Sequence, residues 1–178
     1  YPLPSLTTIM ASMCFYDIEE TEKEAITNAL KRGNTLTFTE KALTQETASL
    51  AKNAEVVGVF VHSTVDREVL DRLPALKILV TLSTGYDHID ISACKERNII
   101  VCNVPTYGEN TVAEHTFALL LALSRRIVDS VDRTRKGNFS LEGLRGFDLK
   151  GKTMGIIGGG HIGMHVARIA KGFEMNVL

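Results

Sequence analysis

The chain has 178 residues, of which 44% are hydrophobic and 23% are charged, and its formal net charge is −1 at pH 7. A chain of this length and composition can bury a core and corresponds to one domain, or to one domain and part of another. The near-zero charge, without a basic tail or an acidic run, argues against a nucleic acid or a membrane surface as partner.

The cysteines and the missing export signals favour a cytoplasmic protein. Cys14, Cys94 and Cys102 are widely spaced and include no C-x-x-C pair, which is typical of reduced, buried thiols rather than of a disulfide framework. No apolar stretch reaches the length of a membrane span, and the N-terminus lacks a basic region followed by an apolar signal core. We therefore expect the cytoplasm as compartment and no membrane partner.

Strands and helices alternate through the first part of the chain. Apolar runs bounded by turn residues predict strands at 7–15, 35–38, 55–61, 77–82 and 99–103. Helices are predicted at 18–32, 66–73 and 91–97. Short strands that alternate with helices predict a parallel sheet covered on both faces. We assign residues 1–108 to one α/β domain.

A long helix is predicted next, because no Pro or Gly interrupts residues 110–136. It would be about 40 Å long at 1.5 Å per residue, with a bend or break before its end. Thr111 and Glu114 have the spacing of a capping box at its start. The run 117–123 (FALLLAL) is apolar all round, which predicts burial on every side, between domains or between subunits. We accordingly expect a homodimer.

Glycines spaced as G-x-G-x-x-G follow the Gly-rich connection 137–152. Gly158 allows a tight turn, Gly160 permits a phosphate to approach, and Gly163 permits close packing of a helix on a strand. The motif joins a predicted strand at 153–157 to a predicted helix at 161–173, and a strand at 175–178 follows. The free N–H groups of such a helix face an anion. This βαβ unit predicts a dinucleotide pyrophosphate site, and a Gly-rich turn without a ligand is the weaker alternative.

One part of such a site is missing. An acidic residue that binds the adenosine ribose is expected about 20 residues beyond the first glycine, and from Gly158 this count reaches Leu178, the last residue. A doubly wound nucleotide domain has two βαβαβ halves, of which a single βαβ unit is present. We therefore expect a C-terminally truncated chain, in which the residue that discriminates NAD from NADP lies past the end.

Three further blocks stand out beside the glycine motif: 61–65 (VHSTV), 83–90 (STGYDHID) and 103–114 (NVPTYGENTVAE). In order and spacing the four blocks together resemble the D-isomer-specific 2-hydroxyacid dehydrogenases, the family that includes D-lactate and D-3-phosphoglycerate dehydrogenases. The D-lactate-dehydrogenase-like branch is the most similar. The resemblance implies a flavodoxin-like parallel-sheet substrate domain at 1–108, followed by the first βαβ unit of a Rossmann NAD-binding domain at 109–178.

The resemblance also implies an activity, the NAD-dependent interconversion of a small D-2-hydroxy acid and a 2-oxo acid. The residues that it assigns to substrate binding are Val61, His62, Ser63, Gly85, Tyr86 and Tyr107. Those that it assigns to cofactor binding are Thr111, Gly158, Gly160, His161, Ile162 and Gly163. The family's catalytic arginine, glutamate and histidine have no counterpart within the chain, so no catalytic residue is assigned and the chain alone is expected to be inactive.

The histidines of the chain point to no base and to no metal. His161 and His165 are spaced like two ligands of a zinc helix, but a third ligand is missing. His115 is expected to pack in the long helix, and His88 to order its turn. His62 follows directly from a buried strand into the mouth of a parallel sheet, where ligands of such folds bind. A substrate-facing role and a structural one both stay open for His62.

Two other interpretations share the scaffold. The same fold could oxidise formate, phosphite or phosphoglycerate, and turnover of a panel of acids would separate these reactions. An alternative from another class is a non-catalytic NAD-binding interaction protein, similar to the family's transcriptional corepressors. The absent catalytic residues favour that alternative, whereas truncation explains the same absence more simply.

Overall fold

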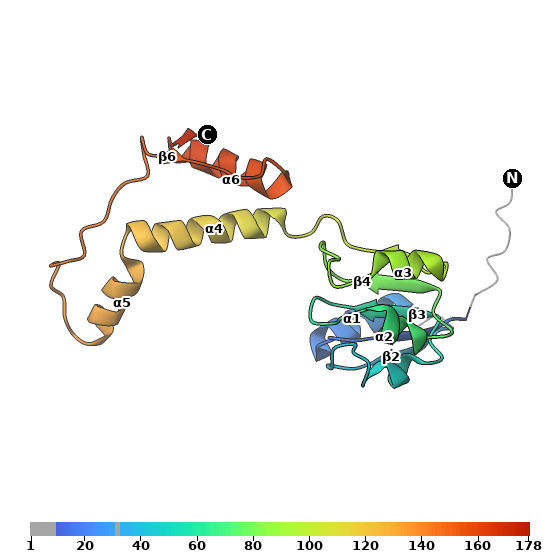
Figure 1. Ribbon diagram of the computed structural model, residues 1–178. Coiled ribbons are helices and arrows are strands. Elements are labelled where there is room, and N and C mark those ends of the chain that lie inside the picture. Colours follow the sequence, from blue (N-terminus) through green and yellow to red (C-terminus); the bar gives the residue numbers. More distant parts are fainter. Residues whose placement is uncertain (1–9, 31–32) are drawn as a thin grey trace, which may run out of the picture. The chain divides into compact units, whose positions relative to one another are not determined.

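The computed structural model describes residues 10–30 and 33–178. The chain divides into two compact units, Tyr1–Pro105 and Thr106–Leu178 (Figure 1). Each unit has its own sheet and its own buried core.

The first unit is built around one sheet of five strands in which all neighbours run parallel. The strand order is β2-β1-β3-β4-β5, which is the flavodoxin-like order of a doubly wound fold. The predicted α/β class and parallel sheet are confirmed. In chain order the elements are β1 (Ser12–Phe15), α1 (Glu20–Leu30), β2 (Thr35–Phe38), the 3-10 turn η1 (Ala48–Ala51), β3 (Val56–Val59), α2 (Arg67–Asp71), β4 (Ile78–Thr81), α3 (Ile91–Glu96) and β5 (Ile100–Cys102).

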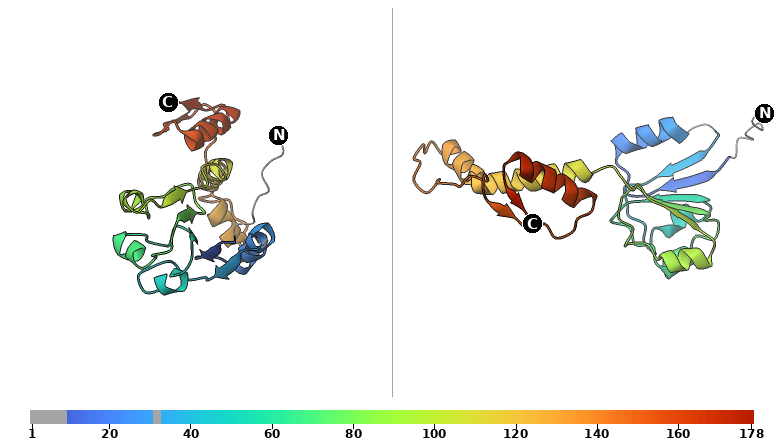
Figure 2. Two further views of the ribbon diagram at one scale, coloured as in Figure 1. Left: turned by 90° about the vertical axis from the view of Figure 1, so that its right-hand side faces the viewer. Right: turned by 90° about the horizontal axis from the view of Figure 1, so that it is seen from above.

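Helices cover both faces of this sheet, with α1 on one face and α2 and α3 on the other (Figure 2). The predicted strands and helices of the unit are all present, and most are shorter than predicted because their end residues form turns and caps. Strand β1 begins at Ser12, and the residues 7–9 that were also predicted as strand lie outside the described residues. The same holds for residues 31–32 at the predicted end of the first helix.

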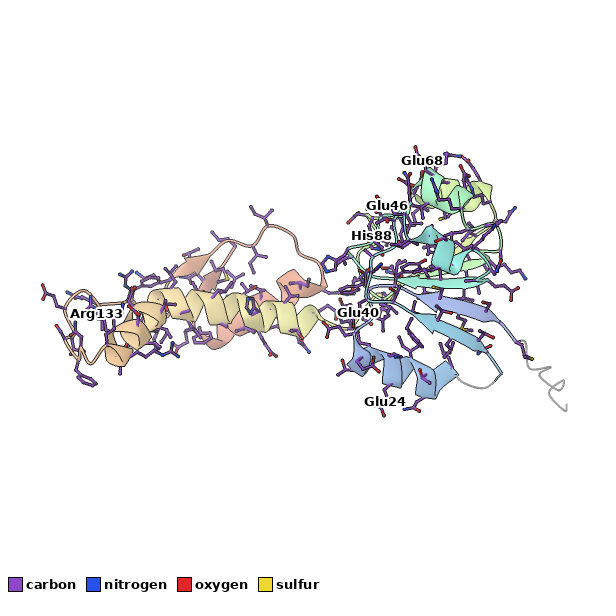
Figure 3. The ribbon with its side chains drawn as sticks, turned by 90° about the horizontal axis from the view of Figure 1, so that it is seen from below. Glu24, Glu40, Glu46, Glu68, His88 and Arg133 are labelled. Atoms are coloured by element: carbon purple, nitrogen blue, oxygen red, sulfur yellow. The ribbon has the colours of Figure 1, made fainter. Side chains whose placement is uncertain are left out.

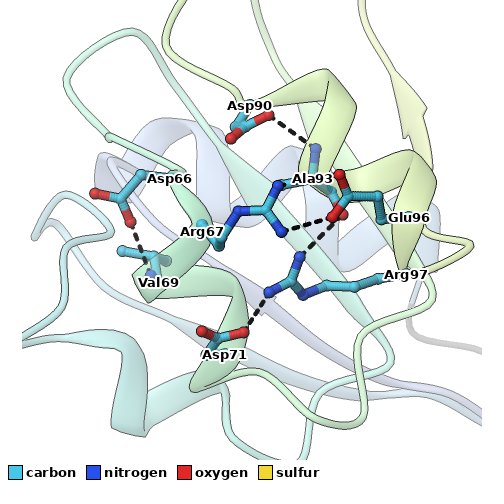
Figure 4. Close-up of polar contacts among 8 residues, drawn as sticks. All are labelled: Asp66, Arg67, Val69, Asp71, Asp90, Ala93, Glu96 and Arg97. Atoms are coloured by element: carbon cyan, nitrogen blue, oxygen red, sulfur yellow. Dashed lines mark hydrogen bonds and ion pairs between the residues drawn. The ribbon is translucent and has the colours of Figure 1, made fainter.

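Two aspartates fix where α2 and α3 begin. The carboxylate of Asp66 accepts a hydrogen bond from the N–H of Val69 at 2.8 Å, and that of Asp90 accepts one from the N–H of Ala93 at 2.8 Å (Figure 4). Each aspartate thereby satisfies a donor that the helix itself leaves without a partner, as an N-cap residue does. The two loops that precede α2 and α3 therefore have defined ends.

Two ion pairs join α2 to α3 on the surface of the unit. The guanidinium of Arg67 donates to both carboxylate oxygens of Glu96, at 2.6 and 3.1 Å. Arg97, which follows α3, pairs with Asp71 at the end of α2 (Figure 4). Both pairs are solvent-exposed, so each contributes little to stability. Their effect is to hold the helices in one orientation.

The carboxyl ends of the strands gather at one edge of the sheet. Phe15 pairs with Gly58 and Gly58 pairs with Val80, so the loops that follow β1, β3 and β4 leave the sheet at the same level. The chain order reverses between the neighbours β1 and β3. In open parallel sheets, ligands bind outside the carboxyl ends of the strands at such a reversal.

The cysteines do not all behave as expected. Cys14 and Cys94 are buried, whereas Cys102 is exposed. Cys102 ends β5, which is the outermost strand of the sheet, and an outermost strand has a neighbouring strand on one side only. The expected burial of this thiol is wrong for that reason.

The second unit contains one βαβ unit and two further helices. Its elements are α4 (Glu109–Ser124), α5 (Ile127–Arg135), β6 (Thr153–Met154), α6 (His161–Gly172) and β7 (Asn176–Val177). Strands β6 and β7 run parallel, so the predicted strand-helix-strand arrangement is confirmed. The Phe117 ring of α4 stacks on that of Phe173, with centroids 5.4 Å apart. Ala113, Val166 and Ala170 complete the buried contact between α4 and α6.

The predicted long helix is broken, and its predicted capping box is wrong. Helix α4 ends at Ser124, and Arg126 takes a left-handed conformation with φ of 54° before α5 begins. The Ser124 carbonyl accepts from the N–H of Phe147 at 2.9 Å, so a later loop replaces the helical partner. At the other end Gly108 is the N-cap, which places Thr111 inside the first turn rather than before it.

Described residues of the second unit cover one face of α4. Phe117 is 3% exposed, whereas Leu119 and Leu123 are 60% and 63% exposed. The expected burial of the apolar run on every side is therefore not met by this chain alone. Among the described residues, no helix has both the length and the apolar character that a bilayer crossing requires.

Candidate functional site

The loop after β3 presents two backbone N–H groups that meet no partner in residues 10–30 and 33–178. Phe60 N–H donates to the carboxylate of Asp17 at 3.3 Å and Ser63 N–H to the carbonyl of Phe60 at 3.1 Å. Between them, the N–H groups of Val61 and His62 meet no acceptor in the described part of the chain. Adjacent unpaired N–H groups in a loop are suited to an anion.

Ser63, in contrast, faces the interior. It is 1% exposed, and its hydroxyl donates to Asp17 at 2.7 Å and accepts from the N–H of Leu43 at 2.8 Å. Its own N–H is also engaged in the turn. The structure thus places the three predicted residues of this loop together but leaves free donors on two of them.

A hollow of about 580 Å³ lies beside this loop. His62 and Phe60 form part of its wall, and their rings meet edge to face with centroids 6.2 Å apart. The rest of the wall comes from the ends of β1 and β2 and from the start of α1; Glu40, which follows β2, is labelled in Figure 3. The remaining wall residues are Asp17, Ile18, Glu19, Thr21 and Glu22. Four of the wall side chains are carboxylates, so the hollow is acidic.

Buried hydroxyl groups hold the turn after β4 in place. The hydroxyl of Thr81 contacts that of Ser83 at 2.6 Å and Nε2 of His88 at 3.1 Å. Ser83 in turn donates to the carbonyl of Gly85 at 2.7 Å. Within the described residues, the N–H groups of Gly85 and Tyr86 have no acceptor. The second loop therefore repeats the pattern of the first, with side chains that fix the backbone and two donors left over.

The two loops are joined to each other. The N–H of Val65 donates to the carbonyl of His88 at 2.8 Å, and the N–H of Asp90 donates to the carbonyl of Val65 at 2.9 Å. These bonds form a short parallel bridge between the loop after β3 and the turn after β4. The free N–H groups of both segments therefore belong to one rigid edge of the first unit.

The glycine turn lies in the second unit. Gly158 has φ of 102°, a conformation open to glycine. A Cβ on Gly163 would lie 2.0 Å from the carbonyl oxygen of Gly158, whereas one on Gly160 would meet nothing within 4 Å. The first helical bond of α6 runs from Met164 to Gly160, so the N–H groups at His161, Ile162 and Gly163 point out of the helix start.

The remaining predicted cofactor and substrate residues of this unit lie near helix starts. Thr111 is exposed in the first turn of α4, and Tyr107 is 61% exposed just before it. Nδ1 of His161 lies 3.5 Å from the carboxylate of Glu109, the first residue of α4. Within residues 10–30 and 33–178, no group of three or more acidic, histidine or cysteine side chains could hold a metal ion.

Comparison with known proteins agrees with this geometry. The profile described as "D-isomer specific 2-hydroxyacid dehydrogenase, catalytic domain" matches residues 12–156. The chain belongs to this family. A 2-hydroxyacid dehydrogenase homolog of Haemophilus influenzae is 46% identical over 145 residues, which are 80% of this chain and 44% of that protein.

Two further relatives extend the comparison. The D-lactate dehydrogenase of Escherichia coli is 42% identical over 148 residues, covering 82% of this chain and 45% of its own length. The crystal structure of D-lactate dehydrogenase from Aquifex aeolicus, complexed with NAD and lactic acid, superposes with a TM-score of 0.85 at 35% identity, covering 93% of this chain and 50% of that one. The chain spans about half the length of the curated relatives it matches.

Sequence reasoning missed one polar residue of this family member's site. Asp17 supports the loop after β3 through Ser63 and Phe60, yet no motif contains it. The available signal was its position, because it follows β1 at the carboxyl edge where the neighbouring loops also emerge.

His88 is expected to make folding sensitive to acid. Burial lowers its pKa below the ordinary 6.5, and the charges of Asp87 and Asp17 oppose this effect only in part. Because the folded pKa is the lower one, the unfolded chain binds the proton more readily, so stability present above pH 6.5 is lost as pH falls through the folded pKa. Urea unfolding should show a smaller loss of stability on acidification for His88→Gln than for the wild type. Equal losses in the two proteins would contradict this role.

Proposed function

We propose that the chain provides the substrate-binding and cofactor-binding segments of an NAD-dependent oxidoreductase that interconverts a D-2-hydroxy acid and a 2-oxo acid, with D-lactate and pyruvate as the expected pair. The observation that carries this proposal is the edge of the first unit where Val61, His62, Gly85 and Tyr86 offer N–H groups that have no acceptor among the described residues. Membership of the family supports it.

The substrate carboxylate is assigned to this edge. A carboxylate accepts several hydrogen bonds at once, and bonds to a charged acceptor are stronger than those between neutral groups. Donors that already lie in place need no reordering when the anion arrives. His62 lines the hollow beside these donors, which favours its substrate-facing role. Tyr107 is proposed to contact the substrate on the strength of the family resemblance.

The cofactor diphosphate is assigned to the start of α6. Gly158 supplies the turn, Gly160 leaves its Cβ position open, and the N–H groups of His161, Ile162 and Gly163 supply donors at the positive end of the helix. When bound, NAD supplies the hydride acceptor or donor of such a reaction. The structure of the Aquifex aeolicus relative contains NAD and lactic acid, which supports the same pair of ligands here. Thr111 is proposed to lie near the nicotinamide.

We further propose that residues 1–178 do not catalyse turnover by themselves. His88 is held by Thr81, which leaves it a poor proton carrier. Among the described residues, the single histidine paired with a carboxylate is His161, at the glycine turn. An imidazole positioned by a carboxylate beside the substrate loops is the arrangement expected of a general base, and no histidine of the first unit has it within the described residues.

Other activities on the same fold are less well supported. Phosphoglycerate carries a phosphate group besides its carboxylate, so the four carboxylates of the hollow would repel it more strongly than a 2-oxo acid with a single charge. Formate and phosphite lack the side chain that a hollow of about 580 Å³ could accept. A non-catalytic NAD-binding interaction protein, similar to a corepressor, shares the glycine turn and is distinguished by a lack of turnover in the full-length gene product.

A homodimer and a cytoplasmic address complete the proposal. Leu119 and Leu123 expose an apolar strip on α4, and exposed apolar surface of this kind is typical of a protein interface. The cytoplasmic compartment is proposed from the wide spacing of the three cysteines, which include no C-x-x-C pair.

Turnover tests the proposed function directly. The full-length gene product should oxidise NADH with pyruvate or another small 2-oxo acid, followed as loss of NADH absorbance, and should be slower with phosphorylated or dicarboxylic 2-oxo acids. Purified residues 1–178 should show no turnover under the same conditions. A full-length protein that binds NADH but converts no acid would favour the corepressor-like alternative, and turnover by residues 1–178 would contradict their proposed inactivity.

Replacing Gly160 with Val tests the diphosphate site. Gly160 has φ of −73° and ψ of −168°, which any residue adopts, so Val adds no backbone strain, although Val is a less favourable N-cap residue than Gly. The added side chain would occupy the space where the diphosphate is assigned, and NADH affinity should fall at least about tenfold, equivalent to about 1.4 kcal/mol. Fluorescence titration with NADH measures this, with Gly172→Ala at the other end of α6 as control. Wild-type affinity in Gly160→Val would remove this role.

The proposed interface predicts a change of oligomeric state. Leu119→Glu together with Leu123→Glu would place two charges on the apolar strip of α4, and sedimentation of the full-length gene product should then show a monomer. Leu141→Glu is the matched control, because Leu141 is 83% exposed but lies outside α4. A dimer that survives the double substitution would place the interface elsewhere.

A further inference from the structure

We propose that Asp17 is a positioning residue for the substrate carboxylate, acting through Ser63 and the Phe60 amide without touching the substrate itself. This inference rests on the proposed function and assigns a role to a residue outside the family motifs. Asp17 lies two residues after the end of β1, beside the loop after β3.

The backbone of Asp17 is held in an uncommon conformation. Its φ is 59°, in the left-handed region that residues other than glycine seldom adopt, although aspartate tolerates it better than most. The N–H of Asp17 donates to the carbonyl of Lys41 at 3.1 Å. Ile18 N–H and Thr39 carbonyl form a second bond at 3.1 Å between the same segments. The loop after β2 therefore fixes the direction of the Asp17 side chain.

One oxygen of Asp17 then holds both ends of the substrate loop. Oδ2 accepts from the Phe60 N–H at 3.3 Å, where the loop begins, and from the Ser63 hydroxyl at 2.7 Å, where it ends. An ionised acceptor makes these bonds stronger than neutral ones. The residues between the two contacts are Val61 and His62, whose N–H groups have no acceptor among the described residues.

Ser63 transmits the constraint to a third segment. Its hydroxyl accepts from the Leu43 N–H at 2.8 Å while donating to Asp17. The carbonyl of Leu43 accepts from the N–H of Thr64 at 3.1 Å, so the end of the loop is held at two successive residues. Ser63 is 1% exposed, so its hydroxyl makes these bonds away from water, where hydrogen bonds are stronger.

The charge of Asp17 distinguishes positioning from a direct electrostatic effect. A carboxylate behind the two free N–H groups would by itself repel an incoming carboxylate. If repulsion dominated, neutralising Asp17 would tighten substrate binding. If positioning dominates, the same change weakens binding, because Asn retains the shape but is a weaker acceptor. The two effects therefore have opposite signs in Asp17→Asn.

Steady-state kinetics of the full-length gene product test the inference, with NADH and the most rapidly converted of pyruvate, glyoxylate and 2-oxoisocaproate. We expect Asp17→Ala and Ser63→Ala each to raise the KM for the 2-oxo acid about tenfold, with kcat changed less than about threefold and NADH affinity unchanged. Asp17→Asn should give a smaller increase. The double variant Asp17→Ala/Ser63→Ala should raise the KM no further than the more impaired of the two single variants, because both changes break one network.

Asp66→Ala is the matched control. The Asp66 carboxylate accepts from a backbone N–H at 2.8 Å, as Asp17 does, but at the start of α2 rather than under the substrate loop. It should lower the unfolding midpoint without raising the KM for the 2-oxo acid. An equal rise in KM for Asp66→Ala would show general loosening and overturn the inference, as would an unchanged KM in Asp17→Ala or a lower one in Asp17→Asn. A wild type without turnover would instead overturn the proposed function, and this inference with it.

Discussion

The parallel register of the first sheet is the constraint on which the rest of the unit depends. Strand β1 pairs with both β2 and β3, and β3 pairs with β4, in register through Phe15, Gly58 and Val80. Since parallel strands all end at the same edge, segments far apart in the sequence emerge there side by side. Asp17 can reach Ser63, and Val65 can bridge to Ile89, because the ladder has already aligned the strand ends.

The loops after β3 and β4 satisfy their polar groups in the same way. A loop that holds unpaired N–H groups for a ligand must satisfy its other polar groups, because unpaired buried groups are costly. After β3 this is done by Asp17 and Ser63, and after β4 by Thr81, Ser83 and His88. Within the described residues, no buried side-chain nitrogen or oxygen lacks a partner. The residues that carry the free N–H groups, Val61, His62, Gly85 and Tyr86, are all exposed.

The sequence was sufficient to predict what local pattern and chain order determine. Alternating strands and helices predicted the parallel sheet, and the spacing of Gly158, Gly160 and Gly163 predicted a strand-turn-helix, both of which the structure contains. The position of the helix break at Arg126 could not be predicted from the sequence, because it depends on a hydrogen bond between Ser124 and the distant Phe147.

Asp17 and Cys102 illustrate the same limit. The role of Asp17 arises from contacts with residues 43 and 46 positions later in the chain, which no local motif encodes. The exposure of Cys102 depends on β5 being the edge strand, a property of strand order rather than of the strand's own apolar sequence. The role of Asp17 and the exposure of Cys102 can be predicted only when the neighbours of each strand are known.

The glycines of the second unit differ in whether the fold itself requires them. The fold itself accounts for glycine at two positions. Gly158 has a positive φ, and a Cβ on Gly163 would lie 2.0 Å from a carbonyl oxygen. Gly160 has neither, since its backbone is extended and its Cβ position is open. Open space alone is not distinctive, because Gly155 and Gly172 have it too. What sets Gly160 apart is its place as the N-cap of α6, directly before N–H groups that the helix cannot satisfy. A Cβ there would meet nothing within 4 Å among the described residues, and under the proposed function it would exclude the diphosphate from those donors, so we propose that glycine at this position serves the bound cofactor.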